Sequence, residues 1–186
     1  MATILRLTGR AFRWVEVDSG AGETRTAEFL ALNPAGKIPV AVLPDGTVLR
    51  ESNAILAHFA EGTPWMPAPG LPRTRVLEWM FFEQYSHEPY VAVARNLIAY
   101  LRQRDDARLA GLWTAGYRAF DVMEDRLKAA PWLTDAGATV ADLALFAYTH
   151  VAGEGEFDLN RHPAVQAWLA RVKALPGIET IPPAGA

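Results

Sequence analysis

Short apolar runs in the first fifty residues of the chain have the lengths and turn signals of β-strands. Residues 12–17 (FRWVEV) are aromatic and β-branched, which predicts a buried or half-buried strand. Two further apolar runs, 40–43 and 47–49, flank the sequence Pro-Asp-Gly at 44–46. Because proline presets φ and glycine accepts a positive φ, this turn sequence predicts a hairpin.

Helical segments accompany these strands. Residues 26–32 are expected to form a short helix or helical turn that ends at Asn33-Pro34. Ser52 is a suitable N-cap for a helix over 53–61, and Gly62 is a suitable C-terminal stop. The first sixty residues therefore read as a mixture of strands and helices.

Residues 61–73 (EGTPWMPAPGLPR) separate this mixed region from the rest of the chain. They contain four prolines and two glycines, which sustain neither a helix nor a central strand. The sequence thus predicts a first domain over 1–62, a linker over 63–72 and a second domain over 73–186.

Everything after the linker carries helical spacing. Residues 73–101 are expected to be helical with a kink or break at Pro89. A long helix with an apolar face should end before Pro131, and a last amphipathic helix is expected over 163–175. The remaining helix, 139–152, is apolar nearly all round, which is typical of the buried centre of a bundle. Its first residues, Thr139 to Asp142, form a capping box, which we interpret as structural.

Composition narrows the class of protein. The 186 residues are 51% hydrophobic, with 18 basic and 21 acidic side chains and a net charge of −3. Scattered basic residues argue against a nucleic-acid partner, and no apolar run is long enough for a signal peptide or a membrane span. With no cysteine, disulfides, thiolate metal sites and a cysteine nucleophile are excluded, and we expect a cytoplasmic protein. No metal is expected, since four histidines lie at spacings untypical of ligands: His58, His87, His150 and His162.

Four motifs in order resemble one family over residues 4–179. They are NPAGKIP (33–39), ESNAIL (51–56), TVADLALF (139–146) and the run that starts at His162 with HPAVQAWLARVKALPGIE. Together they resemble the cytosolic glutathione transferase superfamily of bacterial type. The resemblance implies a thioredoxin-like α/β N-terminal domain followed by an all-α helical bundle.

The resemblance also implies a glutathione site around the hairpin. Pro39 would be cis, and the backbone of Ile38 would pair with the cysteinyl residue of the tripeptide. Ser52 would bind the γ-glutamyl carboxylate at a helix N-terminus, Glu51 would meet the ammonium group, and Lys37 would reach the glycine carboxylate. Taken singly, Ser52 is also readable as an N-cap, Glu51 as a solvated strand end and Lys37 as a surface lysine.

Two more expectations concern the helical region. The segment YSHEPY would expose Tyr85, His87 and Tyr90 on a face that helps form the acceptor-substrate pocket in the family; the alternative is an ordinary polar helix face. The helix from Arg73 carries six apolar residues, more than it can bury against its own domain, which favours a homodimer. These residues are Val76, Leu77, Trp79, Met80, Phe81 and Phe82.

The chain departs from the family pattern at its start. Family members begin with a strand, a loop bearing the Tyr, Ser or Cys that stabilises the glutathione thiolate, and a first helix. Here residues 2–10 match the end of that helix, so the first domain is expected to be incomplete and the catalytic residue is unknown. A misassigned start, residues 2–7 in the strand position, and a degraded domain are three explanations that stay open.

The function implied by the resemblance is conjugation of glutathione, as co-substrate, to a small hydrophobic electrophile. This explains how a chain without cysteine performs sulfur chemistry, because glutathione supplies the thiol. The alternative is a non-catalytic glutathione-binding or dimeric interaction module that lacks the thiol-activating residue.

Overall fold

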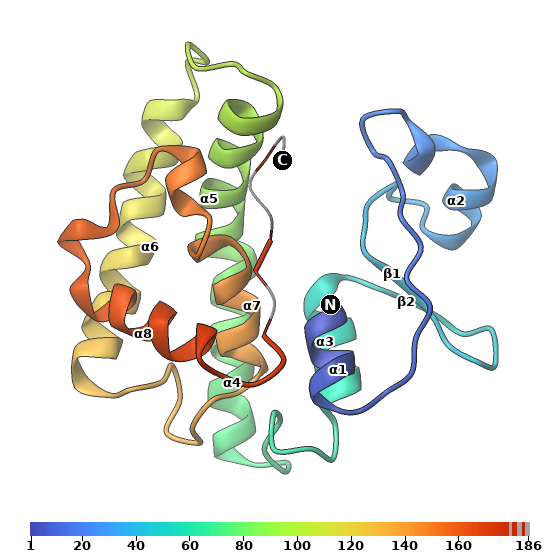
Figure 1. Cartoon of the computed structure of the whole chain (residues 1–186), viewed down its shortest axis with the longest axis horizontal. Helices are drawn as coiled ribbons and strands as arrows, with labels where there is room; N and C mark the ends of the chain where they lie inside the picture. Colours follow the sequence, from blue (N-terminus) through green and yellow to red (C-terminus); the bar gives the residue numbers. More distant parts are fainter. Residues whose placement is uncertain (179, 182–183, 185–186) are drawn as a thin grey trace. The chain divides into compact units, whose positions relative to one another are not determined.

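The structure is a computed structural model that describes residues 1–178, 180–181 and 184 (Figure 1). The chain divides into two compact units, residues 1–61 and 62–186. Within the described residues, no helix is long and apolar enough to cross a membrane.

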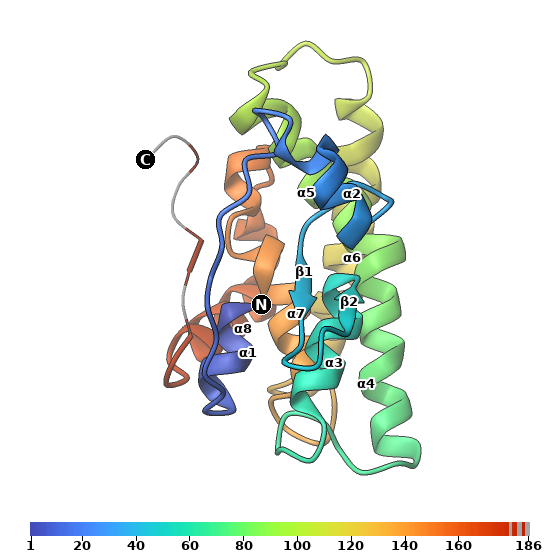
Figure 2. The same ribbon diagram turned by 90° about the vertical axis from the view of Figure 1, so that its right-hand side faces the viewer.

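The first unit combines short helices with one antiparallel hairpin, which leads directly into α3 (Figure 2). Helices α1 and α3 contact each other, and the side chains of Ile4 and Ile55 are fully buried there. Thr26 caps α2 by accepting a hydrogen bond from the N–H of Phe29, and the helix ends before Asn33 as expected. In chain order the elements are α1 (Ala2–Leu7), η1 (Glu23–Arg25), α2 (Ala27–Leu32), β1 (Val40–Val42), β2 (Val48–Arg50) and α3 (Ser52–Ala60).

The prediction of a strand over residues 12–17 is wrong. In the part of the chain that the structure describes, residues 11–17 make no backbone hydrogen bond, and Trp14 and Val15 are exposed. Aromatic and β-branched residues favour a strand only where a neighbouring strand supplies the ladder and a surface to pack against. Residues 2–7 are helical, as the resemblance implies, so the explanation that places them in a strand is also wrong.

The second unit is helical throughout. Helix α6 contacts α5 and α8, and α4 contacts α7. As expected, the helix that begins near Arg73 is interrupted before Pro89, by the π-helical turn η2, and α6 ends before Pro131. The elements are α4 (Leu71–Phe82), η2 (Glu83–His87), α5 (Glu88–Arg95), η3 (Asn96–Tyr100), α6 (Leu109–Ala129), α7 (Val140–Thr149), η4 (Ala152–Gly155), η5 (Leu159–Arg161) and α8 (Pro163–Lys173).

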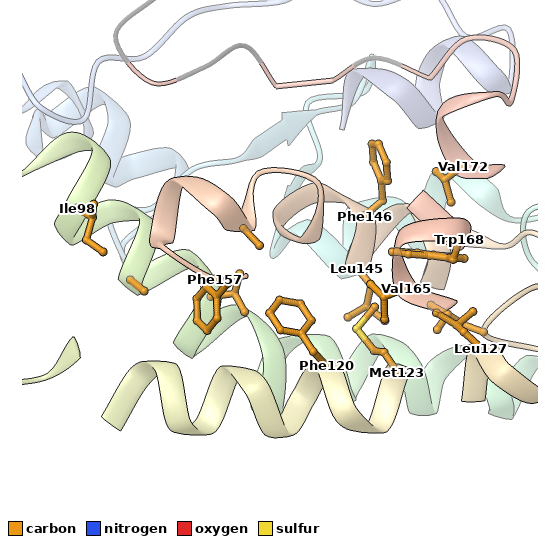
Figure 3. Packing of buried hydrophobic residues seen from close by; sticks show 14 of the residues in the cluster. Ile98, Phe120, Met123, Leu127, Leu145, Phe146, Phe157, Val165, Trp168 and Val172 are labelled. Atoms are coloured by element: carbon orange, nitrogen blue, oxygen red, sulfur yellow. The ribbon is translucent and has the colours of Figure 1, made fainter. Parts of the chain in front are cut away.

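Aromatic and aliphatic side chains from α5, η3, α6, α7 and α8 form the core of this unit (Figure 3). Phe120 and Met123 of α6 face Leu145 of α7 and Val165 of α8, and all four side chains are fully buried. Helix α7 is buried along most of its length, which confirms it as the centre of the bundle.

The capping box at the start of α7 is also confirmed. Asp142 Oδ2 accepts from the N–H of Thr139 at 2.9 Å, while Asp142 Oδ1 accepts from Trp168 Nε1 at 2.9 Å and from the N–H of Leu133. Burial raises the pKa of the Asp142 carboxyl, against these hydrogen bonds, which lower it. The carboxylate therefore joins α7 to α8, and all of its partners are structural.

Candidate functional site

The register of the hairpin brings the two halves of the expected glutathione site together. Val40 pairs with Arg50 in the β1–β2 ladder. Moving two positions outward on each strand leads to Ile38 on one side and Ser52 on the other, so both lie at the open end of the hairpin. The opposite end is closed by the Pro-Asp-Gly turn at 44–46.

Ile38 presents unpaired backbone groups at this end. The Ile38–Pro39 bond is cis, as expected, and Ile38 is 52% exposed. Among the described residues, neither its N–H nor its C=O has a hydrogen-bond partner. One donor and one acceptor on adjacent backbone positions are what an extended peptide needs to pair as an added strand.

Glu51 and Ser52 form the junction between β2 and α3. The structure corrects the expected N-cap: Glu51 occupies that position without a side-chain cap, and Ser52 is the first helical residue. A single residue turns the chain from strand to helix, so Glu51 adopts φ 64° and ψ 118°, a conformation rare outside glycine. In the described chain, the hydroxyl and N–H of Ser52 have no partner, and both lie at the positive end of a helix dipole.

Lys37 is exposed beside Ile38, and its carbonyl is held by a residue that the sequence analysis treated only as a helix stop. Asn33 is buried, and its Nδ2 donates to the C=O of Lys37 at 2.7 Å. Arg50, also missed, donates from Nε to the C=O of Leu32 at 2.6 Å. The signal for Asn33 was present, since Asn-Pro steps are typical of side-chain-to-backbone turns.

Thr3 and Thr8 carry the hydroxyl groups of α1 and of its C-terminal end, the part of the chain that matches the family's first helix. Thr8 Oγ1 donates to the C=O of Ile4 at 2.8 Å, and a hydroxyl has one proton to give. Thr3 is half-buried on α1. No catalytic residue is therefore assigned.

The three residues expected at the acceptor pocket do not share one environment. Tyr85 is 82% exposed and Tyr90 is half-buried. His87 is fully buried in the helical unit. Its ring lies edge-on to the ring of Phe120, with 5.4 Å between the ring centroids. His87 cannot present its ring to a substrate on the exposed face, because η2 turns it into the core.

Histidine environments differ widely as well. Nε2 of His87 contacts Thr149 Oγ1 at 2.9 Å, and burial lowers the pKa of His87 to about 3. His162 is buried against Asp121 Oδ1, while His58 is exposed and His150 Nδ1 bonds the C=O of Phe146. Within residues 1–178, 180–181 and 184, no group of three or more His, Cys, Asp or Glu side chains is placed to hold a metal ion.

Comparison with known proteins identifies the family to which the chain belongs. Residues 2–61 match the glutathione S-transferase N-terminal domain, and residues 80–176 match the glutathione S-transferase C-terminal domain. The chain belongs to the glutathione transferase family, and its fold is a thioredoxin-like N-terminal domain followed by a helical C-terminal domain.

Individual relatives cover nearly the whole chain. The crystal structure of a glutathione S-transferase from Xanthobacter autotrophicus Py2 is 66% identical, with a TM-score of 0.94 over 98% of this chain and 90% of that one. The disulfide-bond oxidoreductase YfcG of Escherichia coli is 28% identical over 89% of this chain and 80% of its own length. A glutathione transferase homolog from Lodderomyces elongisporus, solved with two GSH per subunit, shares the fold at 24% identity and a TM-score of 0.84, over 95% of this chain and 88% of that one.

Proposed function

We propose that this protein is a glutathione transferase that joins the glutathione thiolate to a small hydrophobic electrophile. The observation that carries the proposal is the unpaired N–H and C=O of Ile38, exposed at the same hairpin end as Ser52. Membership of the family supports it, and so does the GSH bound in the structure of the Lodderomyces elongisporus homolog.

In this proposal the hairpin end binds the tripeptide at three places. The backbone of Ile38, beside Pro39, pairs with the cysteinyl residue, and the hydroxyl and N–H of Ser52 bind the γ-glutamyl carboxylate. The Glu51 carboxylate meets the ammonium group, and Lys37 lies one residue away for the glycine carboxylate. Each charged group of glutathione thus meets an opposite charge or a helix dipole.

The thiol itself comes from glutathione. A free thiol has a pKa near 8.5, so only a minor fraction is ionised at neutral pH, and the reaction needs a group that favours the thiolate. The electrophile would bind against aromatic side chains of the helical unit, for which exposed Tyr85 and half-buried Tyr90 are candidates.

A second candidate function is glutathione binding without catalysis. It is favoured by the Thr8 hydroxyl, whose proton is committed to its own helix. A protein with the tripeptide site and no donor for the thiolate would hold glutathione, or a partner, without accelerating conjugation.

Two measurements on the intact chain separate these functions. Calorimetry with glutathione should show binding under either proposal, and its absence would overturn both. Turnover of an aryl halide electrophile above the rate without enzyme supports the transferase. Binding without turnover instead supports the binding module.

Ser52→Ala tests the carboxylate contact directly. Loss of a charge-assisted hydrogen bond should weaken glutathione binding by about 1–2 kcal/mol. Ser19→Ala, on an exposed loop of the same unit, is the matched control and should bind like the unchanged protein. Equal affinities for the two variants would leave Ser52 with no role in binding.

We also propose that the protein is cytoplasmic and that it forms a homodimer through α4.

A further inference from the structure

One buried side chain closes the loop that carries Ile38. Asn33 is 4% exposed, its Oδ1 accepts from the N–H of Ala35 at 3.2 Å, and its Nδ2 donates to the C=O of Lys37 at 2.7 Å. Its backbone N–H donates to Phe29, and its C=O accepts from Gly36. These partners fix the orientation of the side-chain amide. If Oδ1 and Nδ2 were exchanged, the NH2 group would face the N–H of Ala35 and the amide oxygen would face the C=O of Lys37.

The bond to Lys37 determines where the next N–H points. The C=O of Lys37 and the N–H of Ile38 belong to one planar peptide unit, and in a trans unit these groups point in opposite directions. The Lys37–Ile38 bond is trans. Since the C=O of Lys37 points to buried Asn33, the N–H of Ile38 is turned away from the loop interior, where it has no partner in the described chain.

Neighbouring contacts also hold the loop. Gly36 has φ 61°, and a Cβ atom there would meet Arg25 Nη1 and lie 3.1 Å from the C=O of Thr24, so the backbone of the loop packs closely on residues 24–25. At the other side, Arg50 Nε bonds the C=O of Leu32. The end of α2 is therefore tied both to the Ile38 loop and to the strand that leads into Glu51.

We propose that Asn33 is a positioning residue for glutathione: by holding the Lys37 carbonyl, it aims the Ile38 N–H at the cysteinyl residue of the tripeptide. The inference rests on the proposed glutathione site and adds a residue that touches no substrate. If Asn33 were only structural, replacing it would lower the stability of the first unit, and glutathione affinity would not depend on the direction of the Ile38 N–H.

Asn33→Asp isolates the bond. The variant keeps the size and the acceptor for Ala35 but sets a carboxylate oxygen against the Lys37 carbonyl, so the loop loses its hold on that peptide. Calorimetry should show glutathione affinity reduced about tenfold. Asn33→Ala, which loses the bond without adding charge, should be reduced to a similar extent.

Ala35→Asp is the matched control, because it adds the same charge to an exposed position of the same loop and leaves Asn33 in place. It should bind glutathione within about twofold of the unchanged protein. If Ala35→Asp loses as much affinity as Asn33→Asp, or if both Asn33 variants bind normally, the inference is overturned.

NMR on the unchanged protein tests the inference without any variant. The Asn33 side-chain amide protons should exchange slowly with and without glutathione. The Ile38 amide should exchange fast in the free protein and become protected when glutathione is added. Glutathione binding that leaves the Ile38 amide unprotected overturns the positioning role alone, whereas no binding at all overturns the proposed function and the inference with it.

Discussion

At the scale of single residues, the site depends on a backbone conformation that a side chain normally avoids. Glu51 has φ 64° and ψ 118°, between β2 and the first residue of α3. Conformations of this kind cost on the order of 1–3 kcal/mol for a residue with a Cβ, and they persist where surrounding structure holds them. Here the ladder at Arg50 and the helix from Ser52 hold both sides of Glu51.

Glu51→Gly and Glu51→Ala separate the backbone from the carboxylate. Glycine accepts this conformation without strain and alanine does not, so Glu51→Gly should be more stable than Glu51→Ala by about 1 kcal/mol in urea unfolding. Both variants should bind glutathione more weakly, because both lack the group proposed to meet the ammonium. Equal stability of the two would show that the Glu51 conformation carries no cost.

At the scale of elements, buried His87 in η2, the segment between α4 and α5, is hydrogen-bonded to α7. Thr149 Oγ1 donates to the C=O of Leu145 at 2.7 Å, so its one proton is used and Nε2 of His87 is the donor in their 2.9 Å bond. Burial lowers the pKa of His87 to about 3, so the ring is neutral at pH 7, and this bond places its one proton on Nε2. Because His87 ends the π-helical turn η2, this bond ties the interruption of the long helix to the centre of the bundle.

Burial of His87 predicts that the protein loses stability in acid. Burial lowers the pKa of His87 from 6.5 to about 3 in the folded protein, so the unfolded chain binds the extra proton first. The contribution of neutral His87 to the free energy of unfolding is full above pH 6.5. It is lost as the pH falls toward 3, at about 1.4 kcal/mol per pH unit. Chemical unfolding at pH 7 and pH 5 should differ by about 2 kcal/mol more in the unchanged protein than in His87→Gln. The same pH dependence in both would exclude His87 as the cause.

Most helices could be predicted from the sequence because their signals are local. The capping box at Thr139, the break before Pro89 and the stop before Pro131 each depend on residues a few positions apart. Residues 12–17 show the opposite case, since a strand is defined by hydrogen bonds to a partner that composition does not reveal.

Some features of the candidate site could likewise be predicted from the sequence, and others could not. The cis bond at Pro39 was expected from a motif, whereas the burial of His87 depends on η2, which no residue pattern announced. The role of Asn33 depends on where its side chain points, and the sequence shows only that an Asn-Pro step ends α2.

At the scale of the whole molecule, α4 leaves large apolar side chains in solvent. Leu71 is 66% exposed and Phe81 is 71% exposed. Arg75 and Glu78, which form an ion pair at 2.8 Å, lie between them at helical spacing. Exposed aromatic and aliphatic side chains that follow one face of a helix are typical of a surface that pairs with another protein. A second copy of the chain is the partner we propose, because an isologous contact needs only one such surface.

Phe81→Glu tests this proposal. The unchanged protein should show twice the 20.4 kDa mass of one chain in light scattering at micromolar concentration, and Phe81→Glu should shift it to the mass of a single chain, since a buried unpaired carboxylate opposes association. Val122→Glu is the matched control, because Val122 is an exposed apolar residue on α6 rather than α4, and should leave the mass unchanged. A single-chain mass for the unchanged protein would contradict the dimer, and loss of the dimer in Val122→Glu would place the interface on α6 instead of α4.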